Sequence, residues 1–229
     1  RIGLRRLRLA ELGMAAMLHD LGKAFLPKEL MEKSGRFTDE ERARLEEHPV
    51  LGVEALLRVR QYNEGLIKRI LVICEHHAAF REESGAHAYS RIVAVAETFD
   101  ALTSRRPYRP AFLPDAAIKT LIDMGGTRLD RDVVRLFVRT VGLYPAGTLL
   151  ELSSGEQAIV FHPHPDPRLW RTPIVRIVRD RVGAEAPRAP LVDLSERSGG
   201  GEFRRRIIRT LDPAAAGVNV SGYLYAEAT

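Results

Sequence analysis

The stretch Leu18-His19-Asp20-Leu21-Gly22-Lys23 constrains the fold of this chain more than any other. It closes an apolar run at residues 9–18 with helical spacing, and His19 follows Ala15 by four positions, so its imidazole faces the packed side of the expected helix. An imidazole and a carboxylate buried without partners cost several kcal/mol. The fold must therefore supply partners, either a simple His19–Asp20 hydrogen bond or polar groups from other helices. Gly22 is expected to adopt a left-handed cap there.

Helical signals continue as far as Gly142. Thr38 and Glu41 have the spacing of a capping box, and Pro49 is suited to open a helix directly after His48. Asn63 precedes a strongly apolar helical segment, and Asp130 precedes another amphipathic one. These signals predict a series of helices joined by short connections.

The composition changes at residues 144–147. Residues 149–152 and 157–161 alternate in polarity around a Gly-containing turn, which predicts a hairpin. Further strands are expected at 172–178, 190–194 and 203–210, with a linker at 195–201 and no assignment for the tail. We predict a mainly α fold with a small β-rich C-terminal module, divided into residues 1–146 and 147–229.

The composition excludes several classes of protein. A single cysteine, Cys74, rules out a disulfide framework, and no apolar run reaches membrane-spanning length. The net charge is +5, but arginines are scattered among acidic residues, which favours small phosphorylated ligands over polymeric nucleic acid. We expect a cytoplasmic protein. The chain begins with Arg1 inside a helical pattern, which we interpret as a fragment of a longer protein.

Four points in the helical region present the same kind of donor, each more than twenty residues after the last: His19-Asp20, His48, His76-His77 and Asp100. Asp100 is expected on a buried helical face, seven residues after Val93. Imidazoles with carboxylates suit Fe, Mn, Zn or Co. Six donors exceed the needs of one tetrahedral zinc, which indicates two metals that share a carboxylate.

Each of these four positions also has a purely structural interpretation when it is considered alone. His48 can be an ordinary residue before a proline break, and His76-His77 can interact with a helix dipole. The combination argues against these interpretations, because four of the seven histidines fall in it. The other three histidines lie in polar or proline-rich stretches, and we expect them to be exposed to solvent: His87, His162 and His164.

The sequence resembles the HD-GYP branch of the HD phosphohydrolases. The resemblance rests on four segments, of which the last is the most specific: residues 19–23 (His-Asp-Leu-Gly-Lys), 47–49 (Glu-His-Pro), 75–77 (Glu-His-His) and 99–109 (Phe-Asp-Ala-Leu-Thr-Ser-Arg-Arg-Pro-Tyr-Arg). It implies an HD-domain helical bundle. Known members are mostly bacterial signalling phosphodiesterases that open cyclic di-GMP at a centre of two or three metals.

The resemblance also implies roles for individual residues. His19, Asp20 and Asp100 would hold one metal, and Asp20 would bridge to a second metal held by His48, His76 and His77. Lys23 would lie near the scissile phosphate, where it stabilises charge or donates a proton. Arg106 and Arg109 resemble the cations that hold the substrate phosphates, although both can also be surface arginines at a turn. Fe or Mn is the first expectation for the two divalent metals, with Zn, Co or Ni as alternatives.

Two features depart from the family pattern. The Gly-Tyr-Pro triplet is missing from the shortened segment at residues 78–89, so one wall of the pocket is altered. The upstream His or Glu ligands are also absent, which leaves the first metal one protein ligand short.

We therefore expect a cyclic di-GMP phosphodiesterase with an upstream sensor domain outside this chain, and a homodimer is the assembly considered. Two alternatives stay open. One is a non-catalytic module that senses or docks through the same site, and the other is an HD phosphohydrolase that acts on a different nucleotide.

Overall fold

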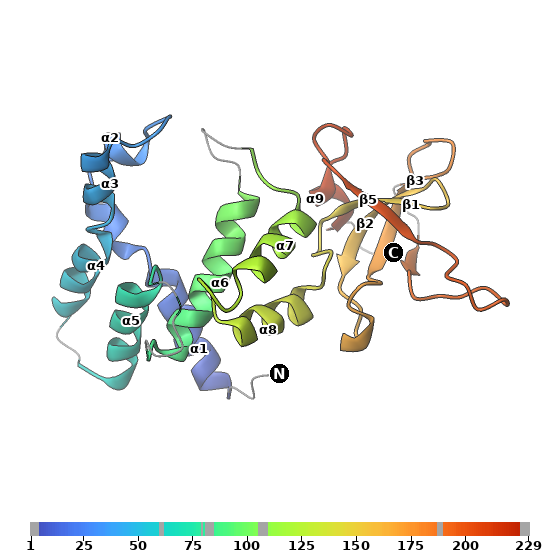
Figure 1. The fold of residues 1–229 in the computed structure, drawn as a ribbon. Coiled ribbons are helices and arrows are strands. Elements are labelled where there is room, and N and C mark those ends of the chain that lie inside the picture. Colours follow the sequence, from blue (N-terminus) through green and yellow to red (C-terminus); the bar gives the residue numbers. More distant parts are fainter. Residues whose placement is uncertain are drawn as a thin grey trace. The chain divides into compact units, whose positions relative to one another are not determined.

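The computed structural model describes residues 5–59, 62–78, 80, 85–104, 110–186 and 190–224. The chain forms two compact units, whose elements are labelled in Figure 1. The first unit comprises Arg1–Ala111 and Leu121–Val134, and the second comprises Phe112–Thr120 and Arg135–Thr229.

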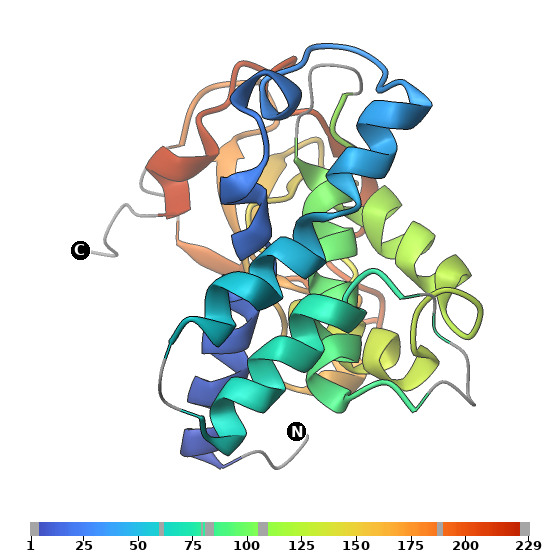
Figure 2. The same cartoon turned by 90° about the vertical axis from the view of Figure 1, so that its left-hand side faces the viewer.

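The first unit is helical. Helix α5 packs against α1, α4 and α6, and the short helix η1 packs against α4 (Figure 2). Helices α7 and α8 each pass from one unit into the other. The elements are α1 (Arg6–Leu18), η1 (Leu21–Phe25), α2 (Lys28–Met31), α3 (Asp39–Leu45), α4 (His48–Leu57), α5 (Glu64–Glu75), α6 (Ala88–Thr103), α7 (Pro114–Met124) and α8 (Arg131–Val141).

The predicted helix starts are confirmed. Thr38 forms a reciprocal capping box with Glu41, and Asn63 accepts a hydrogen bond from the Leu66 amide at the start of α5. Pro49 lies in the first turn of α4, where its missing N–H costs no hydrogen bond. Asp130 accepts the amides of two residues at the start of α8. Two of these features, at Pro49 and Asn63, fix where α4 and α5 begin, the helices that carry His48 and lead to His76.

Two apolar clusters hold the helical unit together. Ala15 of α1 packs with Val72 of α5 and Val93 of α6, which confirms that the Ala15 face of α1 points inward. Ile73 of α5 packs with Leu56 of α4 in a second cluster. Burying a valine, leucine or isoleucine side chain stabilises a fold by about 1.5–3 kcal/mol. Both clusters lie one turn or less from a histidine at a helix end, so the core positions these histidines directly.

Gly22 allows η1 to approach α4 closely. A Cβ added at Gly22 would lie 1.7 Å from the His48 carbonyl oxygen and 2.7 Å from the Gly52 amide nitrogen. Gly22 is not among the glycines with positive φ, so the predicted left-handed cap is wrong. The chain instead enters η1 directly after Asp20, and glycine is required there because backbone meets backbone.

The second unit contains an antiparallel five-stranded sheet in the order β4-β3-β2-β1-β5. The predicted hairpin is confirmed as β1 and β2, and β4 pairs back on β3 as expected. Residues 195–201 were predicted as a linker. Within this segment Arg197 forms an antiparallel backbone bridge with Phe203, and the Arg197 guanidinium lies over the Phe203 ring. The strands are β1 (Leu149–Leu152), β2 (Gln157–His162), β3 (Ile174–Arg179), β4 (Leu191–Asp193) and β5 (Ile207–Leu211), with a short helix η3 (Pro167–Leu169) before β3.

Both faces of this sheet are covered. Leu150, Val160 and Val175 are buried in a cluster that includes Tyr144, whereas Leu149 and Ile159 point to the opposite face, as alternation in a strand requires. Residues of the tail pack on that second face, including Tyr223 of α9 (Val220–Leu224). The tail, which the sequence left unassigned, therefore completes the core of the sheet unit.

The change from helix to strand falls between Val141 and Leu149, close to the predicted boundary at residue 146. The compact units divide elsewhere, because the start of α7 and most of α8 pack with the sheet. Asp115 of α7, for example, accepts a hydrogen bond from Thr210 of β5 at 3.0 Å. Independent folding of residues 1–146 stays a prediction. The mainly α class with a small β module is confirmed.

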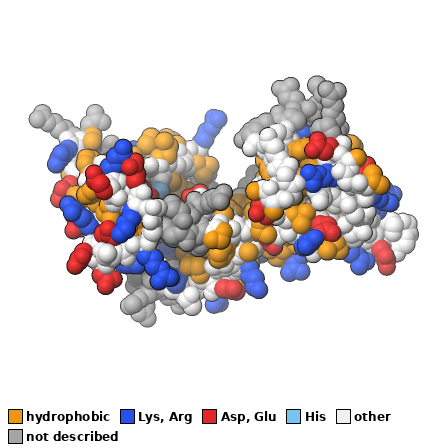
Figure 3. Space-filling model, turned by 90° about the horizontal axis from the view of Figure 1, so that it is seen from above, with side chains coloured by type: hydrophobic (Ala, Val, Ile, Leu, Met, Phe, Trp, Pro, Cys, Tyr) orange, Lys and Arg blue, Asp and Glu red, His pale blue; other side chains and the backbone are white. Residues whose placement is uncertain are grey.

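The surface carries charges of both signs. Figure 3 shows Lys and Arg side chains lying among Asp and Glu side chains on the visible face. In the sheet unit, Arg205 and Arg209 form ion pairs with Glu156 and Glu151 at 2.7 and 2.6 Å. Among the described residues, no helix combines the length and the apolar character needed to cross a membrane.

The Gly22 contact leads to a test with a matched control. Gly22→Ala should lower the free energy of unfolding by about 3 kcal/mol or more, because neither backbone partner can yield as a side chain does. Gly13→Ala, on exposed α1 with nothing near its Cβ, should raise it by roughly 0.5–1 kcal/mol. Urea unfolding followed by circular dichroism measures both. Equal stabilities for the two variants would contradict the close packing of η1 on α4.

Candidate metal centre

Among the residues that the structure describes, helix ends and the middle of α6 bring six possible metal ligands together in the helical unit. They form two overlapping groups, and within each group one donor atom per residue lies within 4.8 Å of every other. Asp20 and His76 belong to both. The first group is Asp20, His48, His76 and His77, and the second is His19, Asp20, His76 and Glu97. The groups thus combine the C-terminal ends of α1 and α5, the first residue of α4, and the middle of α6.

Three of the histidines are oriented in the same way. The Nδ1 of His19 donates to the Ala16 carbonyl at 2.6 Å, and that of His48 donates to the Leu45 carbonyl at 2.7 Å. The Nδ1 of His76 donates to the Ile73 carbonyl at 2.9 Å. Each carbonyl lies three residues earlier in the chain. Because a carbonyl can only accept, the proton sits on Nδ1 and each Nε2 keeps a lone pair that faces the cluster.

Asp20 lies at the centre of these rings. Its Oδ1 is 3.4 Å from the Nε2 of His48 and 3.8 Å from that of His76, and its Oδ2 is 3.3 Å from the Nε2 of His19. Lys23 also contacts Oδ2, at 2.5 Å. Burial opposes the charged form, but His19, His76 and Lys23 outweigh it and hold the pKa of Asp20 well below its usual range. Asp20 is therefore a permanent carboxylate.

The pKa values of neighbouring titratable groups are also shifted by burial and by the groups around them. Contact with Asp20 raises the pKa of His19, whereas burial lowers the pKa of His48. Burial, together with neighbouring His76 and His48, lowers the pKa of His77 to about 4. His48 and His77 are thus neutral at physiological pH, the form in which imidazole binds metals. Burial raises the pKa of Glu97, which makes its charged form costly without a cation nearby.

Glu97, and not Asp100, completes the second group. Glu97 follows Val93 by four residues and Ser90 by seven, and both of these are buried. Asp100 is exposed and contacts Ser104 at 3.4 Å, so its expected place on a buried face is wrong. The 1.5 Å rise per residue carries it about 4.5 Å past Glu97, into the last turn of α6. Sequence reasoning missed Glu97, although its position relative to Val93 was a usable signal.

Other predicted residues fall outside these groups. Lys23 donates a hydrogen bond to Oδ2 of Asp20, and its role near a phosphate stays a prediction. Arg106 and Arg109 lie outside the described residues, as does much of the shortened segment at 78–89.

The three remaining histidines are half-buried rather than exposed. His87 is half-buried because it caps α6, where its Nδ1 accepts a hydrogen bond from the Tyr89 amide. The Nε2 of His164 lies 3.4 Å from the Asp193 carboxylate, and the Nδ1 of His162 contacts the Pro163 carbonyl.

A pocket of about 490 Å³ opens beside the cluster. This is within the range of roughly 300–1,000 Å³ that ligand sites occupy. His76, His77 and Glu97 line one part of it, so a molecule in the pocket would reach the donor groups. Apolar side chains of α6, of the end of α7 and of the turn that follows it line much of the rest, among them Leu102, Met124 and Leu129. Thr98 and Arg128 also line the pocket.

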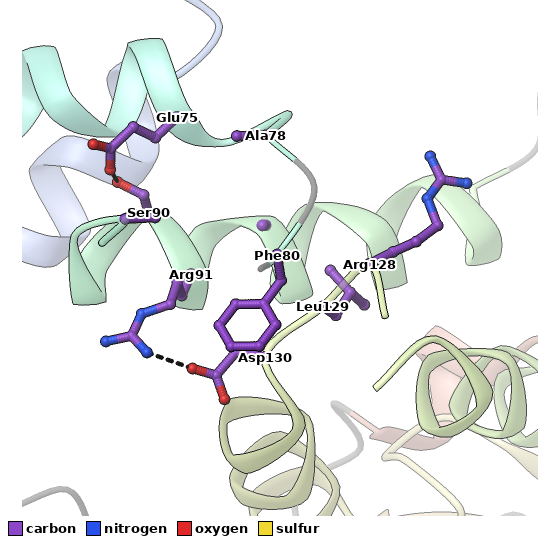
Figure 4. Close-up of a pocket in the computed structure, with 10 residues that line it drawn as sticks. Glu75, Ala78, Phe80, Ser90, Arg91, Arg128, Leu129 and Asp130 are labelled. Atoms are coloured by element: carbon purple, nitrogen blue, oxygen red, sulfur yellow. Dashed lines mark hydrogen bonds and ion pairs between the residues drawn. The ribbon is translucent and has the colours of Figure 1, made fainter. Parts of the chain in front are cut away.

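A second, smaller pocket shows how this region is braced. Glu75, directly before His76, accepts hydrogen bonds from the Ser90 hydroxyl at 2.7 Å and from the His87 amide at 2.9 Å. Arg91 of α6 pairs with Asp130 at 2.6 Å (Figure 4). Because these contacts link α5, α6 and the start of α8, they fix the direction in which His76 and Glu97 point.

The donor set fits a divalent metal. The Nε2 of His19 and the Oδ1 of Asp20 are buried and make no hydrogen bond with described groups. Such atoms normally have a partner, and each unpaired one costs about 1–3 kcal/mol. A cation between the rings would satisfy both. Mixed nitrogen and oxygen donors, without sulfur, suit Fe, Mn, Zn or Co.

Comparison with known proteins agrees with this geometry. A family model described as "HD domain" matches residues 1–133. A cyclic di-GMP phosphodiesterase of Pseudomonas aeruginosa is 33% identical over 176 residues, which cover 73% of this chain and 41% of that protein. The cyclic di-GMP phosphodiesterase response regulator RpfG of Xanthomonas campestris is 33% identical over 147 residues, 60% of this chain and 38% of RpfG.

A 3′3′-cGAMP-specific phosphodiesterase of Vibrio cholerae is 26% identical over 132 residues, which cover 54% of this chain and 25% of that protein. The chain thus spans well under half the length of each of these relatives. The similarity therefore concerns one part of larger proteins.

The two carboxylates of α6 give the sharpest test of this site. Glu97→Gln should weaken binding of manganese at one site at least about 10-fold. Mutating even a residue that only hydrogen-bonds to a metal ligand typically lowers metal affinity by about 10–100-fold. Asp100→Asn, one turn further along the same helix, should leave binding unchanged. Isothermal titration of the metal-free proteins with Mn²⁺ measures both. The assignment fails if Asp100→Asn loses the metal and Glu97→Gln keeps it.

Proposed function

The chain belongs to the HD domain family, and from that premise we propose that it is a metal-dependent phosphodiesterase of the HD-GYP type that hydrolyses cyclic di-GMP. The observation that carries this proposal is the pair of donor groups that share Asp20 and His76 beside a pocket of ligand size. Relatives named as cyclic di-GMP phosphodiesterases support the choice of substrate.

Two divalent ions, Fe or Mn in the first place, would occupy the two groups. His48, His76 and His77 would hold one and His19 and Glu97 the other, with Asp20 shared between them. Ions held in this way supply a water of lowered pKa and polarise a phosphate oxygen. The carboxylate of Asp20 is suited to the shared position because it stays charged and offers two oxygens.

Lys23 would act on the phosphate rather than on the ions. Its ammonium group is held 2.5 Å from Asp20, at the edge of the donor groups. From there it can neutralise negative charge that develops on the phosphate, or donate a proton to the departing ribose oxygen. Arg106 and Arg109 would bind the phosphates as forked cations. Hydrolysis of one phosphodiester bond would open the ring and yield the linear dinucleotide.

The altered segment at residues 78–89 favours a second candidate. Because the Gly-Tyr-Pro triplet is missing there, the pocket wall differs from that of the HD-GYP pattern. We expect slow turnover for this reason, and a non-catalytic module that binds the nucleotide is the alternative. The similarity to a 3′3′-cGAMP-specific phosphodiesterase supports a different cyclic dinucleotide as substrate. An upstream sensor domain, a homodimer and a cytoplasmic location stay predictions.

Asp20→Asn tests the proposed reaction. The substitution keeps the side-chain shape but removes the shared charge, so turnover of cyclic di-GMP should fall at least about 100-fold, while the fold is retained. Product formation by manganese- or iron-loaded protein, followed by chromatography, measures it. Binding of cyclic di-GMP by the wild type without turnover under any metal loading would favour the non-catalytic module.

Lys23→Met separates phosphate chemistry from metal binding. The variant should keep its metal content while kcat falls by roughly 100-fold, the lower range for loss of a general acid. Lys28→Met is a matched control, because Lys28 is exposed on α2 and its ion pair among the described residues is with Glu32, itself exposed, at 3.5 Å. Elemental analysis and steady-state kinetics on the three proteins give the answer. A fall in metal content with Lys23→Met would assign Lys23 a structural role instead.

A further inference from the structure

The pocket beside the metal groups has a cation on its wall. Of the described residues that line it, Arg128 is the one lysine or arginine, and it comes from the turn between α7 and α8. The metal ligands His76, His77 and Glu97 line the same pocket. A ligand in this pocket can therefore meet the metals and the guanidinium of Arg128 at the same time.

The backbone that carries Arg128 is held firmly. The amides of Arg128 and Leu129 both donate to the Met124 carbonyl, at 3.0 and 3.1 Å, and the Gly126 amide donates to the Leu129 carbonyl at 2.7 Å. Gly126 has a φ of 90°, which closes the turn and which L-residues with side chains rarely adopt. The Arg128 carbonyl in turn accepts the Phe80 amide at 3.0 Å. The position of Arg128 is thus set before any ligand binds.

The side chain of Arg128, in contrast, is exposed. Figure 4 shows its guanidinium extending away from Phe80 and from the Asp130 carboxylate, which is paired with Arg91. In the part of the chain that the structure describes, Arg128 forms no side-chain hydrogen bond or ion pair. A fixed backbone with an uncommitted guanidinium is the arrangement expected of a ligand-binding arginine.

We infer that Arg128 binds the second phosphate of a cyclic dinucleotide, the one that the metal groups do not hold. This inference rests on the proposed function. A cyclic dinucleotide carries two phosphodiester groups on opposite sides of its ring, and one metal centre can engage only one of them. The other keeps its negative charge, and the guanidinium of Arg128 on the lining of the same pocket can bind it. The apolar wall formed by Leu102, Met124 and Leu129 would contact the bases and riboses between the two phosphates.

The test compares Arg128→Gln and Arg128→Lys with the wild type. Steady-state kinetics with cyclic di-GMP give kcat and KM for the manganese-loaded proteins, and titration with a phosphorothioate analogue that resists hydrolysis gives binding alone. Arg128→Gln should raise KM and the dissociation constant about 10-fold, since one charge-assisted contact at an exposed site is lost. The value of kcat should change less than about 3-fold. Arg58→Gln, exposed at the end of α4 and outside the pocket lining, is the control and should match the wild type.

The lysine variant tests whether Arg128 acts through its charge. Arg128→Lys should recover part of the affinity, because it keeps the positive charge that a phosphate attracts but loses the fork. If Arg128→Lys binds no better than Arg128→Gln, charge is not what Arg128 supplies, and the second-phosphate assignment is overturned. If Arg128→Gln binds as the wild type does, the inference fails, whether or not the wild type turns substrate over. If the wild type shows no turnover and Arg128→Gln still binds the dinucleotide more weakly than the wild type, the inference is supported and the enzymatic function is rejected.

Discussion

The carboxylate of Asp20 is the group on which the rest of the helical unit depends. It lies within 3.3–3.8 Å of ring nitrogens from the ends of α1 and α5 and the start of α4, and it contacts Lys23 of η1. These groups keep it charged in spite of burial, which makes it a fixed negative centre among the histidine rings. A charge in such a place is costly unless cations approach it. The fold has therefore been shaped around a positive charge at this point.

Packing explains how that arrangement is reached. Gly22 lets η1 touch the backbone of α4, which brings Asp20 to His48. Ala15 and Val72 hold α1 on α5, and Ile73 holds α5 near α4. The carbonyls that orient each Nδ1 lie three residues before each histidine, in the last turn of α1 for His19, in the last turn of α5 for His76 and at the end of α3 for His48, so short-range contacts set the ring orientations. Local structure and the core together fix the rings, and no long loop is required.

Much of this could be predicted from the sequence, because the signals were local. Caps at Thr38 and Asn63, the break at Pro49 and the alternation in β1 and β2 each depend on a few neighbouring residues. The choice between Glu97 and Asp100 was different. Both lie near the phase of Val93, and only the tertiary structure decides how far along α6 the other helix ends reach. Arg128 and the tail on the sheet carry no periodic signal, so their roles depend on contacts that sequence spacing does not encode.

Diffraction at the manganese absorption edge from crystals of the metal-loaded protein tests the central claim most directly, because anomalous scattering locates each ion without assumptions about its ligands. The account predicts two ions that share Asp20, one among His48, His76 and His77 and the other beside His19 and Glu97. A single ion, or an ion bound by Asp100 in place of Glu97, would contradict it.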